Sequence, residues 1–353
     1  MTLFRPSRLV LPRPSRRRVL GGLAAGAATA LLPAAGGGGR AQAADPTYKI
    51  FMITWRGWED ASQGFKDYLD RRGVRTELIV RDAGRSRDKV AEHVQEAKAT
   101  RPDLVYTWGT TTALTAFGKV GQADPATQIT DIPSVFTIVS DPIGSDLVEA
   151  YDEPRPNLTG TLYIAPVETQ LRTIQAYGEF KSLGAVFNPQ ESNARLTIAQ
   201  VAKLAERDGF RLIQQPATID ASGKPDPASI PEKVRAVKDQ GAEWLYIPPD
   251  SFLNVNRDSL TSAAMNIGLP SFAGAENFIR DSHGLLGLVS RYYNVGQFTG
   301  YIAEQILVGG KKPSEIPIES LDRFSLLVNM ETARTLGFYP PMSMLTIAEF
   351  VQA

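Results

Sequence analysis

The feature that most constrains the fold is a repeated alternation of short apolar runs with longer amphipathic runs. Tyr48–Thr54, Leu104–Trp108 and Ser134–Ser140 have the length and β-branched content of strands. Asp60–Arg72 and Ser86–Thr100 are helical in pattern and separate such strands; Ser86 is placed to cap the second helix. Apolar strands that alternate with helices predict a parallel sheet covered on both faces.

The same alternation begins again near Leu158 and continues almost to the end of the chain. Further strands are expected at Glu77–Val80, Leu158–Ile164, Gly184–Phe187, Phe210–Ile219, Trp244–Pro248, Ser271–Ala275, Leu285–Ser290 and Phe324–Val328. Further helices are expected at Thr111–Lys119, Val167–Phe180, Ser192–Arg207, Ala228–Lys238, Leu253–Asn266, Val295–Leu307 and Glu331–Leu336. The sequence therefore predicts an α/β protein with two doubly wound, Rossmann-like lobes.

The first 43 residues have the composition of an export signal. They contain seven arginines and no acidic residue, followed by an Ala/Gly/Leu-rich run at Leu20–Ala35 and the small-x-small sequence Ala41-Gln42-Ala43. Ser15–Leu20, with its run of arginines, matches the twin-arginine signal. We expect residues 1–43 to be a twin-arginine signal peptide and the mature protein to act in the periplasm.

Charge and cysteine content exclude several classes of function. The chain has 38 basic and 38 acidic residues, so removing seven arginines leaves 31 against 38 and a net charge near −7. A mildly acidic surface argues against nucleic-acid binding. The absence of cysteine excludes disulfides, thiolate metal sites, a cysteine nucleophile and a cysteine-linked lipid anchor. We expect no cofactor and no metal.

Ligands of open α/β sheets bind beyond the carboxyl ends of the strands, so the residues that follow each strand are the candidate site. Nearly every such loop carries a hydroxyl, amide, carboxylate, guanidinium or aromatic group. The candidate ligand-binding residues are Trp55, Arg56, Thr110, Thr111, Asp141, Glu191, Ser192, Asn193, Asp250, Ser251, Glu276, Arg291 and Tyr292.

Four segments together resemble the ABC-transporter substrate-binding family typified by the tryptophan-binding lipoproteins of Gram-positive bacteria. They are Val135–Val148 with Asn157–Gly160, Leu183–Asn193, Tyr292–Gly300 and Leu327–Gly337. The resemblance covers about Lys49 to Gly337. It implies a type I periplasmic-binding-protein fold in which three chain crossings form a hinge. The first lobe would be residues 44–161 with about 291–317, and the second 162–290 with about 318–353.

The chemistry of these loops suggests how a ligand would be held, with alternatives for each group. Thr110 and Thr111, like Ser192 and Asn193, open helices whose N–H groups can receive a carboxylate. Thr110 and Ser192 could instead cap those helices.

An ammonium group would need a carboxylate from Asp141, Asp250 or Glu276, although Asp141 could be a turn residue and Asp250 a cap. Trp55 and Tyr292 could offer rings to an apolar or planar ligand, although Tyr292 could instead fill the core; Trp108 is expected in the core.

Two positions depart from the family pattern. The first loop contains Arg56 in the sequence Trp-Arg-Gly-Trp where the family has small polar residues, and Arg291 replaces an acidic residue before the tyrosine pair. We hypothesise that Arg56 and Arg291 hold a carboxylate of the ligand, because guanidinium groups bind carboxylates with two parallel hydrogen bonds. Either arginine could instead pair with an acidic residue of the protein surface.

The favoured function is a periplasmic solute-binding protein of an ABC uptake transporter, which captures a small organic ligand, an amino acid or a carboxylate, by closing its two lobes. Its partners would be this ligand, an ABC permease and the ATPase of the transporter.

 The protein would bind no nucleic acid and act as a monomer. His93 and His283 are isolated, and the sequence has no nucleophile, phosphate-loop or dinucleotide motif, so an enzyme is not expected. The alternative that remains open is a sensory module in which the same clamp serves a chemoreceptor or histidine kinase.

Overall fold

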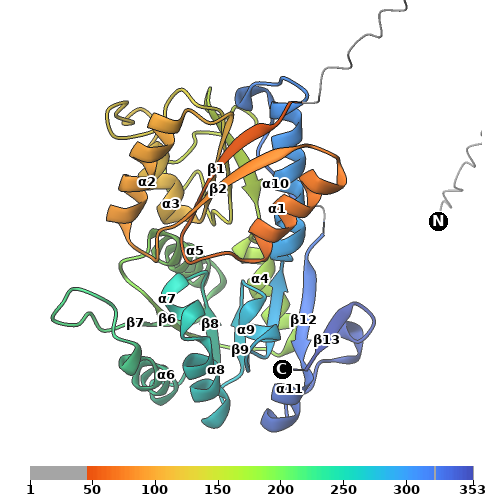
Figure 1. Ribbon diagram of the computed structural model, residues 1–353. Coiled ribbons are helices and arrows are strands. Elements are labelled where there is room, and N and C mark those ends of the chain that lie inside the picture. The colour runs from red at the N-terminus through yellow and green to blue at the C-terminus, as the bar shows by residue number, and fades with distance from the viewer. Residues whose placement is uncertain (1–45, 322, 353) are drawn as a thin grey trace, which may run out of the picture. The chain divides into compact units, whose positions relative to one another are not determined.

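The computed structural model describes residues 46–321 and 323–352. Within this part of the chain two β-sheets form, each covered by helices (Figure 1). The predicted signal peptide, residues 1–43, lies outside the described residues.

The first lobe is a six-stranded sheet with the order β11-β5-β4-β3-β1-β2, and each of its strand pairs is parallel. Its strands are β1 (Tyr48–Thr54), β2 (Thr76–Asp82), β3 (Leu104–Trp108), β4 (Ser134–Thr137), β5 (Leu158–Leu162) and β11 (Glu319–Ser320). Its helices are α1 (Asp60–Arg71), α2 (Arg87–Thr100), α3 (Thr110–Phe117) and α10 (Tyr292–Leu307). Helices α1 and α10 pack on each other at one side of the sheet, and α2 and α3 lie together at the other (Figure 1).

The second lobe is a seven-stranded sheet with the order β13-β12-β10-β9-β8-β6-β7. Its strands are β6 (Ser182–Phe187), β7 (Arg211–Pro216), β8 (Trp244–Ile247), β9 (Ser271–Ala273), β10 (Leu286–Val289), β12 (Ser325–Asn329) and β13 (Ala348–Val351). Its helices are α4 (Val167–Tyr177), α5 (Ser192–Asp208), α6 (Ile230–Asp239), α7 (Ser251–Val255), α8 (Arg257–Asn266), α9 (Asn277–Arg280) and α11 (Met330–Leu336). Unlike the expected all-parallel sheet, β12 runs antiparallel to β10, because the chain enters it from the first lobe.

The two lobes are joined by three passages of the described chain: β5 to α4, β10 to α10, and β11 to β12. The two-lobed α/β fold is thus the one that the sequence predicts. The third passage was expected near residue 317, but Glu319 and Ser320 pair with Thr161 and Leu162 in the first sheet. The chain therefore leaves the first lobe only after Ser320.

Local hydrogen bonds explain where several helices begin and end. Ser86 caps α2 as predicted, since its side chain accepts from the Lys89 N–H. The predicted single helix over 253–266 is wrong, because the chain breaks at Asn256 between α7 and α8. The Asn256 side-chain amide donates to the Phe252 carbonyl at 2.8 Å, which competes with regular helical geometry.

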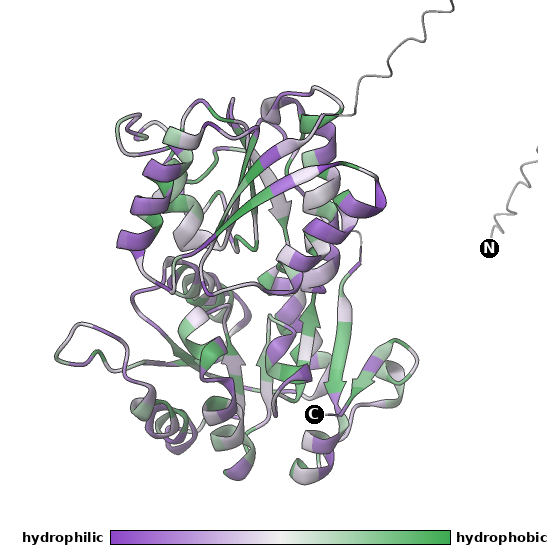
Figure 2. Cartoon of the chain, in the orientation of Figure 1, coloured by the Kyte–Doolittle hydropathy of each residue, from purple (hydrophilic) through white to green (hydrophobic). Residues whose placement is uncertain are grey.

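Apolar side chains occupy the strands and the inward faces of the helices, while hydrophilic residues cover the outer faces of α1 and α2 (Figure 2). The closest packing is between α1 and α10. A Cβ atom added to Gly296 would lie 1.9 Å from the Ala61 carbonyl oxygen, and one added to Gly64 would lie 2.0 Å from that of Tyr293. The backbones of these helices therefore touch directly, which fixes the start of α10 beside the lobe boundary.

We predict that Gly296→Ala lowers the free energy of unfolding by about 2–3 kcal/mol, because backbone rather than a flexible side chain must move. Gly300→Ala is the graded control, since its Cβ would meet Tyr68 Cβ at 2.9 Å and the Phe65 carbonyl oxygen at 3.0 Å, both less close than the contact at Gly296. There the gain in helix propensity of about 1 kcal/mol offsets part of the crowding, so a smaller loss of stability is expected than at Gly296. Urea unfolding of both variants tests this; equal effects would contradict the backbone contact.

Candidate ligand-binding site

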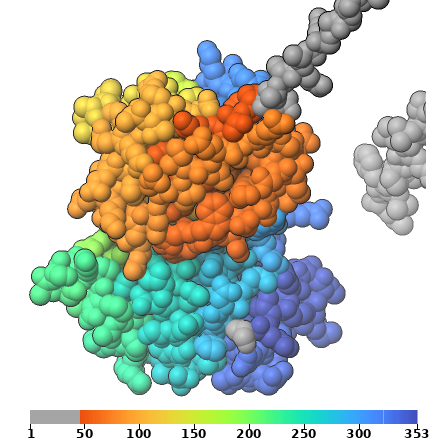
Figure 3. All heavy atoms as spheres, in the orientation of Figure 1, coloured from red at the N-terminus to blue at the C-terminus, as the bar shows by residue number. Residues whose placement is uncertain are grey.

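A small cavity lies between the two lobes, and its walls are formed mostly by residues that follow strands of both sheets. Its volume is about 20 Å³, which is room for roughly one water molecule. The first lobe contributes Trp55, Trp108, Gly109, Thr110, Thr111, Ile138, Tyr163 and Tyr292. The second lobe contributes Asn193, Pro249, Asp250, Ser251, Asn254, Ala275 and Phe278. On the face drawn in Figure 3, atoms of the two lobes are in direct contact along their boundary.

Aromatic rings make up much of the first-lobe wall. The Tyr292 ring lies 6.4 Å from that of Trp108 and 5.7 Å from that of Tyr163, edge to face in both pairs. The Tyr163 hydroxyl is 3.0 Å from Ser140 Oγ. Burial raises the pKa of Tyr163 to about 12, so its hydroxyl stays neutral near pH 7 and can donate a hydrogen bond. This wall can stack on a planar or apolar body.

Arg56 lies beside this aromatic wall. Its guanidinium carbon is 4.8 Å from the centre of the Trp108 ring, in a cation–π arrangement. Its Nε and Nη2 atoms donate to Glu59, at 2.6 and 3.2 Å. Burial lowers the pKa of Arg56, but the charge of Glu59 and the neighbouring phenols raise it by more, so the side chain is always charged.

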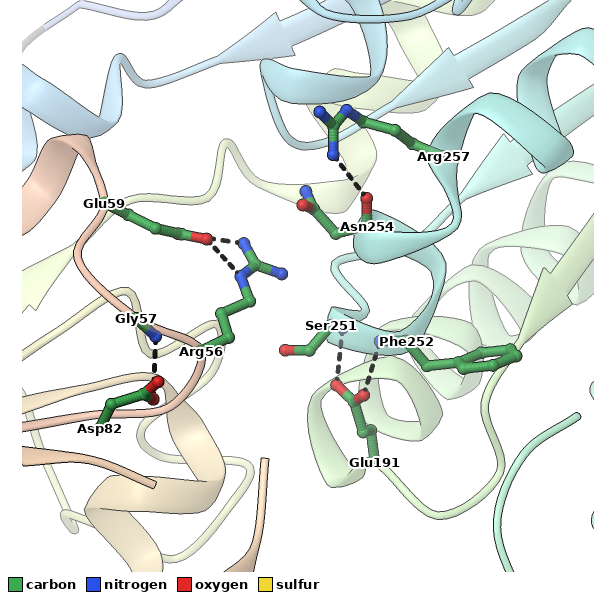
Figure 4. Close-up of polar contacts among 9 residues, drawn as sticks. All are labelled: Arg56, Gly57, Glu59, Asp82, Glu191, Ser251, Phe252, Asn254 and Arg257. Carbon is green, nitrogen blue, oxygen red and sulfur yellow. Dashed lines mark hydrogen bonds and ion pairs between the residues drawn. The ribbon is translucent and has the colours of Figure 1, made fainter. Parts of the chain in front are cut away.

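The conformation of the loop that carries Arg56 is fixed by the residue that follows it. Gly57 has φ +93°, which favours glycine, and its N–H donates to Asp82 Oδ1 at 2.9 Å. Figure 4 shows the third guanidinium nitrogen, which is not bonded to Glu59, on the side that faces Ser251 and Asn254 of the second lobe. Arg56 is therefore held at the lobe boundary with one donor group free of Glu59.

Two buried carboxylates stand on the second-lobe side. Glu191 accepts from the N–H groups of Ser251 and Phe252 at 2.8 and 3.0 Å, so it caps α7 from a neighbouring loop (Figure 4). Asp250 caps the same helix by accepting from Leu253 N–H at 2.9 Å, as the capping alternative predicted. Burial and the charge of Glu191 raise the pKa of Asp250 well above its ordinary value.

At the starts of α3 and α5, the predicted alternative of helix capping by Thr110 and Ser192 is not observed. The N-caps of α3 and α5 are Gly109 and Glu191, neither with a side-chain cap bond, so Thr110 and Ser192 do not cap these helices. Thr110 Oγ instead accepts from Ser140 N–H at 3.3 Å. Asn193 Nδ2 donates to Pro249 O at 2.8 Å. Thr110, Thr111 and Asn193 line the cavity, whereas Ser192 does not.

Asp141 lies outside the cavity and joins the two lobes. Its Oδ1 accepts from Gly144 N–H at 2.7 Å, which confirms the turn interpretation. Its Oδ2 accepts from Nε2 of Gln200, a residue of α5 in the second lobe, at 2.7 Å. Asp141 is thus placed to hold the lobes together and not to contact a ligand in the cavity.

The structure also places Arg291 and Glu276 outside the cavity, which corrects their expected positions. Arg291 forms ion pairs with Glu276 and with Glu349, a residue of β13. Glu276 Oε1 accepts from the Tyr292 N–H at 2.6 Å, and burial raises the pKa of this carboxyl. Arg291 is therefore paired with carboxylates of the protein, outside the cavity in which it was expected to hold a ligand carboxylate. Both residues instead position the start of α10, where Tyr292 lines the cavity.

Several cavity residues were not among the candidates predicted from the sequence. Trp108 is in the core, as expected, and as the last residue of β3 it also lines the cavity. Tyr163 follows β5 directly, but the strand predicted over 158–164 placed it inside a strand. Asn254 was not a candidate because the sequence predicted it inside a single helix over 253–266, not in a loop that follows a strand. Phe278 is on the short helix α9, which the sequence pattern did not indicate.

A wider groove adjoins the cavity and shares Trp55 and Thr111 with it. Its volume is about 950 Å³. The exposed cations Arg85 and Arg87 of the first lobe and Lys224 of the second lobe lie along it. The cavity therefore opens toward a region of positive charge at the lobe boundary.

None of the helices described in the structure is both long and apolar enough to cross a membrane. Among the described residues, no group of three or more acidic or histidine side chains is arranged to hold a metal ion.

Comparison with known proteins defines the class. The chain has the fold of type I periplasmic binding proteins, which the Lac repressor shares (TM-score 0.53, 16% identity, 79% of this chain and 80% of that chain). The family model for ABC transporter substrate-binding proteins matches residues 50–352, so the chain belongs to this family.

Individual relatives are distant in sequence. A tyrosine-binding protein of Clostridioides difficile strain R20291 is 23% identical over 238 residues, which are 67% of this chain and 63% of that protein. A Streptococcus pneumoniae protein solved in complex with L-Trp is 22% identical, with a TM-score of 0.74 over 87% of this chain and 100% of that chain. A conserved domain protein from Vibrio cholerae has a TM-score of 0.76 and 23% identity, with the same coverage.

We predict that Glu191→Ala lowers the free energy of unfolding by about 1–3 kcal/mol, because two buried N–H groups at the start of α7 lose their acceptor. Glu206→Ala, on the exposed face of the same helix α5, is the matched control and should change stability by less than about 0.5 kcal/mol. Denaturant unfolding measures both. Full stability of the Glu191 variant would show that this carboxylate serves the ligand instead.

Proposed function

We propose that this protein is the periplasmic solute-binding protein of an ABC uptake transporter. It captures a small organic solute, an amino acid or a carboxylate with an aromatic body, by closing its two lobes over it. The observation that carries the proposal is a cavity whose walls come from the loops of both sheets. A solute in that cavity contacts both lobes at once.

Closure follows from the size of the cavity. Its volume of about 20 Å³ is smaller than any amino acid, so a solute enters only when the lobes separate. A solute that contacts both walls binds the closed arrangement better than the open one and shifts the equilibrium toward it. The three passages between the lobes are the hinge.

The ligand class is supported by the walls and by the relatives. Trp55, Trp108, Tyr163, Tyr292 and Phe278 supply aromatic contact area. The relatives named above include a tyrosine-binding protein and one solved with L-Trp. The protein would work as an exported monomer, deliver its solute to a permease driven by an ATPase, and perform no catalysis.

Binding and closure are measured on the mature protein, beginning at residue 44. We expect one or more aromatic amino acids or aromatic carboxylates to raise the unfolding temperature, because a ligand at 100 times its Kd adds about 2.7 kcal/mol of stability. The same ligand should reduce the radius of gyration in small-angle scattering. A ligand that stabilises the protein but leaves its scattering unchanged would contradict capture by closure.

The contact between Asp141 and Gln200 gives a second test. Gln200→Ala removes a hydrogen bond of the closed form, worth about 0.5–1.5 kcal/mol, without touching the cavity. Affinity should fall by roughly 2- to 10-fold. Gln95→Ala is the control, because Gln95 donates to Ala126 and Thr127 within the first lobe. Equal affinities of the two variants in calorimetry would exclude a role for this contact in closure.

A further inference from the structure

The indole of Trp108 carries a hydrogen-bond donor that is not used by the described protein. The residue is 3% exposed and lines the cavity. Its Nε1 atom is buried and has no hydrogen-bond partner among the described residues. A buried donor without an acceptor costs about 1–3 kcal/mol, so an acceptor delivered by a ligand would be favoured at this place.

Arg56 supplies a second free donor next to the first. Its side chain is 6% exposed, and its bonds to Glu59 use Nε and Nη2, so Nη1 has no hydrogen bond among the described residues. The guanidinium lies over the Trp108 ring, 4.8 Å from its centre, so the two donor-bearing side chains are neighbours beside the cavity. Two adjacent donors, one of them cationic, match the two oxygens of a carboxylate.

The carboxylates near the cavity are each already bound by groups of the protein, so an ammonium group would have to share a carboxylate with them. Glu59 is bound to Arg56 through both oxygens. Glu191 accepts from two backbone N–H groups and from the side-chain amides of Asn188 and Asn193. Asp250 accepts from the N–H groups of Leu253 and Asn188.

The second-lobe wall opposite Arg56 offers neutral polar groups. Within the described chain, Ser251 Oγ and the Asn254 side-chain amide make no hydrogen bonds with protein, and both face Arg56 in Figure 4. They can bind a hydroxyl, carbonyl or ring nitrogen at the far end of a solute. The cavity thus has the Trp108 N–H and further aromatic rings at one wall, with Arg56 beside that wall and neutral groups opposite.

We infer that Arg56 and Trp108 together bind the carboxylate of the solute, and that the preferred solutes are aromatic carboxylic acids without an α-ammonium group. This inference rests on the proposed function and specifies its substrate class. It assigns specificity to two residues: the arginine that departs from the family pattern and a tryptophan at the end of β3.

The test compares ligands matched in ring and length. Indole-3-propionate is paired with L-tryptophan, and 3-(4-hydroxyphenyl)propionate with L-tyrosine, in calorimetry with the mature protein. Each acid should bind at least roughly 10-fold more tightly than its amino acid, since a bond to a charged group contributes about one to two powers of ten in affinity. Indole-3-propionamide, which keeps the ring but lacks the charge, should bind as weakly as the amino acid.

Four variants assign the effect to the two residues. Arg56→Gln should weaken binding of the acid by roughly 10- to 100-fold, and Trp108→Phe, which keeps a ring but removes the N–H, by roughly 3- to 10-fold. Glu59→Gln should strengthen acid binding, because Arg56 loses its neutralising partner. Arg81→Gln is the matched control: Arg81 forms the same two-bond pair with Glu96 in the first lobe, away from the cavity, and the acid should bind it unchanged.

The inference is overturned if the amino acid of each pair binds as well as its acid, or if Arg56→Gln weakens the amide and the acid equally. Amino acids that bind and reduce the radius of gyration would leave the proposed function intact and remove only this assignment. If neither series binds and a broad solute library also leaves the scattering unchanged, both the inference and the proposed function fall.

Discussion

The structure depends on one geometric constraint: strands of both sheets direct their carboxyl ends toward the same space between the lobes. The loops after β1, β3, β4 and β5 meet those after β6, β8 and β9 around one cavity. Ligand contacts in an α/β fold come from such loops, because there the helix N-termini and side chains converge. Because two sheets face each other in this way, a bound solute is contacted from two sides. It then becomes part of the interface between the lobes.

Most charged groups near the lobe boundary are paired within the protein and fix the positions of helices, whereas one of them keeps a donor that a solute can bind. Glu191 and Asp250 hold the start of α7, and Glu276, Arg291 and Glu349 hold the start of α10. These partners fix the cavity walls because a buried charge without its partner is costly. Arg56 is different, because it is paired with Glu59 and still presents a nitrogen to the second lobe. The indole N–H of its neighbour Trp108 likewise has no hydrogen-bond partner among the described residues.

Much of the fold could be predicted from local patterns. The alternation of apolar and amphipathic runs places most strands and helices, and Ser86 and Asn329 mark helix starts as capping chemistry requires. The site was predicted less well, because it depends on contacts between distant parts of the chain. Arg291 pairs with Glu349 of β13, a strand that the sequence pattern did not indicate, and no local signal announces that partner. Trp108 is a core residue, as predicted, and only its position at the end of its strand indicates that it also lines the cavity.

A crystal structure of the mature protein with a bound aromatic solute tests the central claim most directly. The two-lobed clamp predicts electron density for the solute between the loop at Thr110 and Thr111 and the loop at Pro249–Ser251, in contact with both lobes. Density confined to one lobe, or at a surface away from these loops, would contradict it.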